Sequence, residues 1–251
     1  MKYFLSFLFL LFAFYALEAQ DTMYVHQSGG NILRIPVSQI DSVTFEYSGV
    51  IGETVVDIDG NVYQVVTIGS QKWMKGNLKV TRYNDGTPIP LVTGATEWNQ
   101  SETPAYCWYD NNEAYKHPYG AIYNWYAAGQ PNICPEGWHV PTDEEWTQLT
   151  TYLGGEAEAG NKLKEAGTAH WKSPNTGATN ETGFTALPGG WRFYNDGEFK
   201  ELNEAGRWWT STGHESFLSA AWYRQMKFNG RNVFRHNLLK GHGYCIRCLK
   251  D

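Results

Sequence analysis

Four cysteines offer the clearest chemistry in the chain: Cys107, Cys134, Cys245 and Cys248. In an oxidising compartment an even number of cysteines indicates disulfide bonds, and four of them allow three connectivities. Cys245 and Cys248 also form a Cys-x-x-Cys motif, which is typical of a redox pair or half a zinc site. The residues around this motif alternate with the period of a strand, so the two sulfur atoms would point to opposite faces. We therefore favour the disulfides Cys134–Cys248 and Cys107–Cys245.

Familiar catalytic motifs are missing from the sequence. The seven histidines have no His-Glu-x-x-His spacing, and there is no Gly-x-Ser-x-Gly, P-loop or Gly-x-Gly-x-x-Gly motif. His139 follows Trp138 and is interpreted as a packed, hydrogen-bonded residue. We expect no catalytic residue, metal or cofactor. Carboxylates distant in sequence can still meet in space, so a glycoside hydrolase stays an alternative.

One acidic segment, Asp57-x-Asp59-Gly60-Asn61, resembles a fragment of a calcium loop. The other ligand positions of a twelve-residue loop are missing, notably its bidentate glutamate. We therefore interpret the segment as an Asp-Gly turn between two strands.

Aromatic side chains are the main candidates for binding, because the chain has 11 Trp and 16 Tyr. The rings of exposed Trp and Tyr stack on the C–H faces of sugars and also anchor protein interfaces. We predict a binding surface for a glycan or a cell-surface protein at Trp171, Trp191, Tyr194 and Trp208. If Trp208 and Trp209 lie on a strand, they face opposite sides, so that one of them is available to a ligand. Four other tryptophans lie within motifs and are expected in the core: Trp73, Trp125, Trp138 and Trp146.

The N-terminal segment predicts export. Lys2 precedes an apolar run from Tyr3 to Leu17, and Ala19 provides a small residue for cleavage, so residues 1–19 are expected to be a signal peptide. The run has ~15 residues, fewer than the ~20 that a membrane span needs. The mature protein is thus expected to have no membrane span and to be secreted, at the cell surface or in the periplasm.

The rest of the chain is expected to form a small β-rich leader, residues 20–48, and a main domain, residues 53–251. The leader should contain a hairpin around residues 23–35 and a third strand at residues 42–45. With 20 Lys and Arg against 26 Asp and Glu, the chain has a formal net charge of −6. No basic block is present to neutralise phosphates, so we do not expect nucleic acid as a partner.

The main domain has one clearly signalled helix. Thr142 and Glu145 form a capping box, and Gly154 and Gly155 end the helix. A second helix is expected at about residues 156–166, ending at Gly167. Residues 168–206 have few helix signals and predict a long loop region, whereas residues 207–249 predict four strands.

Several of these segments resemble the FISUMP domain, the Fibrobacter succinogenes major paralogous domain of secreted bacterial proteins. The resemblance spans roughly residues 55–251 and rests on motifs that occur in order: Gly60-Asn61-Val62-Tyr63, Gln71-x-Trp73-Met74-x-x-Asn77-Leu78, Tyr119-Gly120-Ala121-Ile122-Tyr123-Asn124-Trp125, Cys134-Pro135-x-Gly137-Trp138-His139-Val140-Pro141-Thr142-x-x-Glu145-Trp146, Gly183-Phe184-x-Ala186-Leu187-Pro188-Gly189-Gly190 and the closing Arg247-Cys248. It implies an extracellular module without an established activity.

The Val-Pro-Thr-x-x-Glu-Trp segment is also similar to the helix entry of the formylglycine-generating-enzyme branch of C-type-lectin-like folds. This similarity implies an α+β fold with twisted antiparallel sheets, one or two helices and a long irregular loop region. The copper-holding cysteine pair of such enzymes has no counterpart here, nor have the Glu-Pro-Asn and Trp-Asn-Asp motifs of calcium-dependent lectins. We therefore predict a secreted, non-catalytic binding module. The alternatives are an extracellular enzyme, either a hydrolase or a metal-dependent oxidase, and a structural subunit of a surface assembly.

Overall fold

The computed structural model describes residues 22–26, 32–39 and 52–251 of the chain. The contacts divide the chain into two compact units, residues 1–49 and residues 50–251. In the first unit, β1 (Thr22–His26) and β2 (Ile32–Pro36) form an antiparallel hairpin, which is followed by the 3-10 helix η1 (Val37–Gln39). The expected signal peptide and the third strand at residues 42–45 lie outside the described residues.

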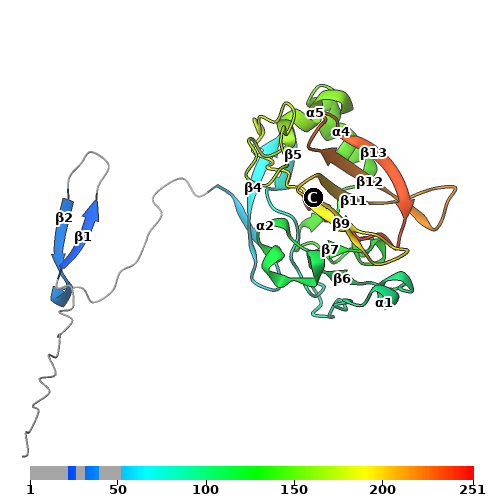
Figure 1. Ribbon diagram of the computed structural model, residues 1–251, viewed down its shortest axis with the longest axis horizontal. Coiled ribbons are helices and arrows are strands. Elements are labelled where there is room, and N and C mark those ends of the chain that lie inside the picture. The colour runs from blue at the N-terminus through cyan, green and yellow to red at the C-terminus, as the bar shows by residue number, and fades with distance from the viewer. Residues whose placement is uncertain (1–21, 27–31, 40–51) are drawn as a thin grey trace, which may run out of the picture. The chain divides into compact units, whose positions relative to one another are not determined.

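The second unit is an α+β domain, as predicted. Its first sheet has the strand order β10-β9-β11-β12-β13 (Figure 1). These strands are β9 (Gly189–Arg192), β10 (Phe199–Leu202), β11 (Ala205–Gly213), β12 (Ala220–Lys227) and β13 (Phe234–Leu239). Neighbours pair antiparallel except β9 and β11, which are parallel. Residues 205–210 of β11 are all buried rather than alternating, because both faces of this strand are covered.

The second sheet, β3-β4-β5-β14-β8, is antiparallel throughout. Its strands are β3 (Thr54–Val56), β4 (Val62–Ile68), β5 (Gln71–Met74), β8 (Trp138–His139) and β14 (Leu249–Lys250). The strand expected at residues 244–249 is reduced to β14, since Gly243, Tyr244 and Cys245 each form an isolated bridge with a different segment. The C-terminal segment therefore holds together regions that are far apart in sequence.

Short elements connect the sheets. They are α1 (Ala95–Asn99), β6 (Tyr106–Cys107), η2 (Tyr109–Asn111), η3 (Glu113–Tyr115), α2 (Lys116–Tyr119), β7 (Ile122–Tyr123) and α3 (Trp125–Ala128). β6 and β7 pair antiparallel in a small sheet of their own.

Two longer helices follow β8. Helix α4 (Asp143–Tyr152) has the predicted capping box: Thr142 Oγ1 accepts from the N–H of Glu145, and the Glu145 carboxylate accepts from the N–H of Thr142 at 2.7 Å. Helix α5 (Glu156–Leu163) ends three residues earlier than expected. It stops there because Lys164 becomes extended and bridges Ala186.

The cysteines confirm one disulfide and correct the other. Cys134 and Cys248 are bonded, with 114 residues of sequence separation. Cys107 and Cys245 are free and buried, so the predicted Cys107–Cys245 bond is wrong. The reason is that Cys107 packs in a small cluster with Trp98, whereas Cys245 belongs to a different cluster of the core. Burial raises the pKa of both thiols to about 12, which keeps them protonated at neutral pH.

Candidate functional site

Two of the four predicted binding residues lie in the core. Trp171 is 1% exposed, and its indole N–H donates to the carbonyl of Ala186 at 2.9 Å. Trp208 is fully buried and donates to Asn77 Oδ1 at 2.8 Å. Its neighbour Trp209 is also fully buried, because both faces of β11 are covered. The expectation that Trp171 and one of the paired tryptophans are open to a ligand is therefore corrected.

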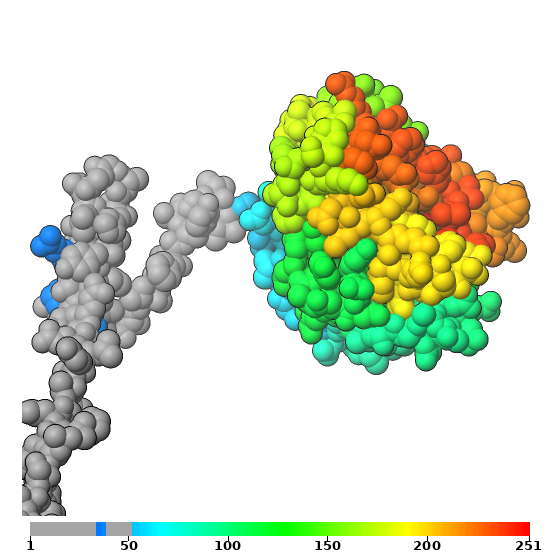
Figure 2. All heavy atoms as spheres, viewed as in Figure 1, coloured from blue at the N-terminus to red at the C-terminus, as the bar shows by residue number. Residues whose placement is uncertain are grey.

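The other two residues, Trp191 and Tyr194, remain partly exposed and come together. They join Phe193 and the buried His242 in what we call the aromatic cluster. Ring centroids lie 5.6 Å apart for Trp191 and Phe193, 5.3 Å for Phe193 and Tyr194, and 4.9 Å for Tyr194 and His242. The segment that contains Trp191, Phe193 and Tyr194, yellow in the colour bar, is at the surface in Figure 2. Sequence reasoning found this part of the surface.

Charged groups lie next to the aromatic cluster. The Arg207 guanidinium stacks over the Trp191 ring at 4.1 Å, and it donates to Glu201 Oε2 at 2.7 Å. The same carboxylate oxygen accepts from the Trp191 indole N–H at 3.2 Å. Arg207 and Glu201 thus fix the orientation of Trp191.

His242 contributes an uncharged ring. Desolvation by burial, together with the nearby charge of Arg207, lowers the pKa of His242 to about 3, so its imidazole is neutral at physiological pH. Its Nδ1 atom and Nη1 of Arg207 are buried without hydrogen-bond partners among the described residues. Unpartnered buried polar atoms cost free energy, and a buried water molecule would supply the missing contacts.

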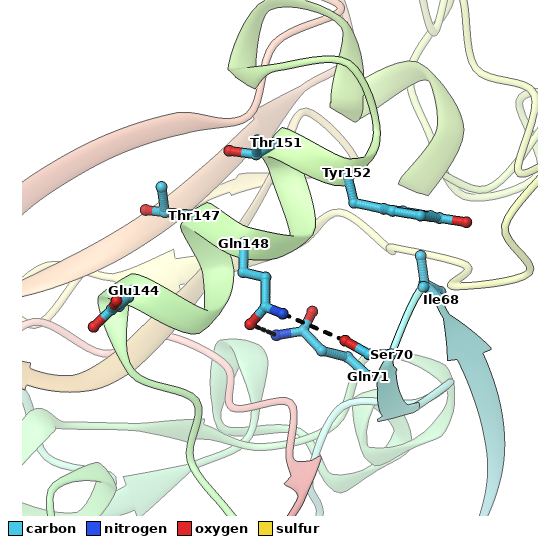
Figure 3. A pocket seen from close by; sticks show the side chains of 9 residues that line it. Ile68, Ser70, Gln71, Glu144, Thr147, Gln148, Thr151 and Tyr152 are labelled. Atoms are coloured by element: carbon cyan, nitrogen blue, oxygen red, sulfur yellow. Dashed lines mark hydrogen bonds between the residues drawn. The ribbon is translucent and has the colours of Figure 1, made fainter.

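A second concave site, which sequence reasoning missed, lies between α4 and the turn that joins β4 to β5. It is a cavity of about 500 Å³ with Ile68, Gln71, Gln148 and Tyr152 among its lining residues (Figure 3). Tyr152 is 67% exposed. The sequence signal that could have revealed this site was Tyr152, an aromatic residue of α4 outside the apolar side that Trp146, Leu149 and Leu153 form.

His139 lies between two carboxylates. Its Nε2 atom is 3.0 Å from both carboxylate oxygens of Glu145, and its Nδ1 atom is 2.5 Å from Asp251 Oδ1. Desolvation by burial opposes the charged ring, but the hydrogen bonds with Asp251 and Glu145 outweigh it and raise the pKa of His139 above its ordinary value. The prediction of a packed, hydrogen-bonded histidine is confirmed. Glu145 serves both this contact and the helix cap.

The His139 arrangement predicts a measurable titration. We expect the imidazole of His139 to titrate above pH 6.5 and Asp251→Asn to lower that pKa. A raised pKa in the folded state stabilises the fold fully below the unfolded pKa, and this contribution is lost as the pH rises through the folded pKa. All three side chains are partly exposed, so the effect on the free energy of unfolding should stay under about 1 kcal/mol. An NMR titration of the ring protons measures the pKa, and a midpoint at or below 6.5 would contradict the assignment.

The Asp57–Asn61 segment is a turn between β3 and β4, as interpreted. Asp57 Oδ1 accepts from the backbone N–H groups of Asp59 and Asn61, and Asp57 Oδ2 accepts from the Tyr63 hydroxyl at 2.6 Å. Asp59 Oδ2 accepts from the backbone N–H of Thr81 at 2.6 Å. The carboxylates of Asp57 and Asp59 therefore accept hydrogen bonds from groups of the protein itself. Within the described ranges, no three His, Cys, Asp or Glu side chains are grouped as metal ligands.

The described chain is thus an α+β domain with one long-range disulfide, a partly exposed aromatic cluster and a separate groove. The family model described as the Fibrobacter succinogenes major domain matches residues 66–250. The chain belongs to this family, which confirms the resemblance seen in the motifs and implies a bacterial origin. No curated protein and no solved structure matches the chain. In the part of the chain that the structure describes, no helix has the length and apolar character to cross a membrane.

Proposed function

We propose that the domain is a non-catalytic module that acts outside the cytoplasm and binds glycans through the aromatic cluster. The observation that carries the proposal is the meeting of Trp191, Phe193 and Tyr194 at the surface, in partly exposed positions. Tyr and Trp rings provide large, rigid contact areas at a low cost in side-chain entropy. Their faces match the apolar C–H faces of pyranose rings.

The polar groups of the site suit sugar hydroxyls. Glu201 is partly exposed and accepts hydrogen bonds from Trp191 and Arg207, so its carboxylate can also accept from a sugar hydroxyl at the surface. His242 is buried and uncharged, so it adds no charge to the site. A few placed polar groups beside aromatic rings are the usual composition of a small-ligand site.

The proposed location rests on the Cys134–Cys248 disulfide. Disulfides persist in secreted and periplasmic proteins and are rare in the cytosol. The expected signal peptide at residues 1–19 agrees with this location. The finer fold assignment, a C-type-lectin-like topology, is part of the same proposal and rests on the Thr142–Trp146 motif at the start of α4. Fold similarity alone does not identify a ligand, so the ligand class rests on the surface.

A protein partner is the second candidate, favoured by one observation. The loop between β11 and β12, orange in Figure 1, projects beyond the strands and exposes Phe217 and Leu218, which are 63% and 79% exposed. Adjacent apolar side chains at a projecting tip are suited to insertion into a partner protein. This contact would leave the aromatic cluster free.

A glycan array with the protein and two variants tests the proposal. Trp191→Ala removes a half-buried ring and the stacking partner of Arg207, so we expect binding to the recognised glycans to fall at least about tenfold. Phe217→Ala, which changes an aromatic residue outside the cluster, should leave glycan binding unchanged. The array therefore separates loss of the cluster from a general effect of removing an aromatic side chain. Unchanged binding by Trp191→Ala, or no binding by the parent protein, would contradict the proposed site.

A further inference from the structure

We propose that the groove between α4 and the β4–β5 turn binds a neutral oligosaccharide chain, with Tyr152 as the platform for one sugar ring. This second site deepens the proposed function, because it rests on glycans as the ligand class but not on the aromatic cluster. The two sites share no residue.

The ring of Tyr152 rests on the β4–β5 turn. Its ring lies against Gly69 so closely that a Cβ atom on Gly69 would meet three ring carbons at 3.2–3.3 Å. Gly69 also has φ +61°, the left-handed conformation that a tight hairpin turn requires. One side of the ring is thus supported by the turn, while the side chain stays 67% exposed. A ring that is already positioned loses little conformational entropy when a sugar stacks on it.

The floor and wall of the groove present neutral hydrogen-bonding groups. Gln148 Nε2 donates to Ser70 Oγ at 3.3 Å, and Gln71 Nε2 donates to Gln148 Oε1 at 3.4 Å (Figure 3). Gln71 is buried and also donates to the carbonyl of Glu145 at 3.0 Å, so the exposed Gln148 is the side chain whose long hydrogen bonds sugar hydroxyls can replace at little cost. Thr151, an exposed residue of α4, adds a hydroxyl group, whereas the Thr147 hydroxyl already donates to the carbonyl of Asp143 and accepts from Arg224.

The charged residues that line the groove favour an uncharged ligand over an anionic one. Glu144 is the one charged residue among those that line the 500 Å³ cavity. An adjoining cavity of about 380 Å³ also has two charged side chains, Lys162 and Glu181, but they pair with each other at 3.2 Å. Outside that pair the groove offers no cationic side chain to an anionic polymer, whereas an uncharged sugar chain needs none.

The shape selects for a chain rather than a single sugar. Both cavities include Ile68, Gly69 and Tyr152 in their lining, so they adjoin at the tyrosine and form one longer groove. Each volume falls within the range of small-ligand pockets, ~300–1,000 Å³. A chain with one residue over Tyr152 and its neighbours in the two cavities uses the whole groove.

Calorimetric titration of the full chain with neutral hexasaccharides tests the inference. The probes are cellohexaose, maltohexaose, mannohexaose and xylohexaose, with hexagalacturonate as the charged comparison. We expect at least one neutral probe to bind more tightly than hexagalacturonate. Tyr152→Ala should weaken that binding at least about tenfold, while Tyr152→Phe should keep it within about threefold, since the ring remains.

A stability check and one further variant complete the test. Tyr152 is largely exposed, so its loss should not unfold the domain, and thermal melting checks this. Thr151→Arg leaves a good helix former on α4 but fills the groove, and it should also weaken binding. Unchanged affinity in both Tyr152→Ala and Thr151→Arg, or no binding of any neutral probe, overturns the inference. If Tyr152→Ala loses binding while Trp191→Ala keeps it, the groove is the glycan site and the aromatic cluster is not. If Trp191→Ala loses binding while Tyr152→Ala keeps it, the proposal for the groove is rejected.

Discussion

Replacing Asn77 with alanine is expected to destabilise the domain by about 3–5 kcal/mol, a large part of the total stability of a typical domain. Asn77 is the centre of a fully buried network. Its Oδ1 atom accepts from the Trp208 indole at 2.8 Å and from Nη2 of Arg247 at 2.9 Å, and its Nδ2 atom donates to the carbonyl of Tyr119 at 2.7 Å. The variant leaves these groups buried without partners, each at the cost of desolvation.

Arg247 makes the loss more severe. Its guanidinium is buried, stacks on Phe184 at 4.2 Å, and also donates to the carbonyl of Phe184. Desolvation by burial lowers the pKa of Arg247 to about 9, so the charge depends on its remaining acceptors. Urea unfolding of Asn77→Ala measures the change, with Asn195→Ala on the surface as the matched control. A loss of less than 1 kcal/mol in Asn77→Ala would contradict the role of this network.

The second large effect concerns the disulfide. We expect the double variant Cys134→Ala, Cys248→Ala to lose ~2–5 kcal/mol, because the bond closes a loop with a sequence separation of 114 residues and restricts the unfolded chain. The bond also joins the residue before β14 to a segment close to β8, the two strands that pair at the edge of the second sheet. Reduction of the parent protein should produce a similar loss.

Thiol mapping provides the control for the disulfide experiment. Peptide mapping of the unfolded, unreduced protein should find Cys107 and Cys245 as free thiols and Cys134 joined to Cys248. Cys107→Ala, which removes only a buried thiol, should cost less than the double variant. A linkage of Cys107 to Cys245, or equal losses in the two variants, would contradict this account.

Local signals predicted the two longest helices, α4 and α5, but not the short helices α1, α2 and α3. The Thr142–Glu145 capping box is confirmed because both partners are three residues apart, within one turn. The end of α5 was missed because it depends on a bridge between Lys164 and Ala186, which no local pattern encodes. Residues 168–206 contain β9 and β10 as well as turns: β9 pairs antiparallel with β10 and parallel with β11, and neither short strand has a strong local signal.

The predicted binding residues show the same contrast between local signals and long-range packing. Trp191 and Tyr194 could be chosen from composition and position, but Trp171 and Trp208 could not be excluded, since burial is set by what folds over them. For Trp208 the partner is Asn77, separated by 131 residues. Tyr152 was overlooked because its exposure on α4 is meaningful only beside Gly69 of the β4–β5 turn. Long-range packing decides which aromatic residues are available.

The most direct measurement of the proposed function is an NMR titration of the 15N-labelled protein with the glycan that binds best on the array. Each tryptophan contributes one indole N–H signal, and Trp191 differs from Trp171 and Trp208 in its partial exposure. The account predicts that the Trp191 signal shifts with glycan concentration while the buried Trp171 and Trp208 signals stay in place. A saturable titration in which the Trp191 signal does not move would contradict binding at the aromatic cluster.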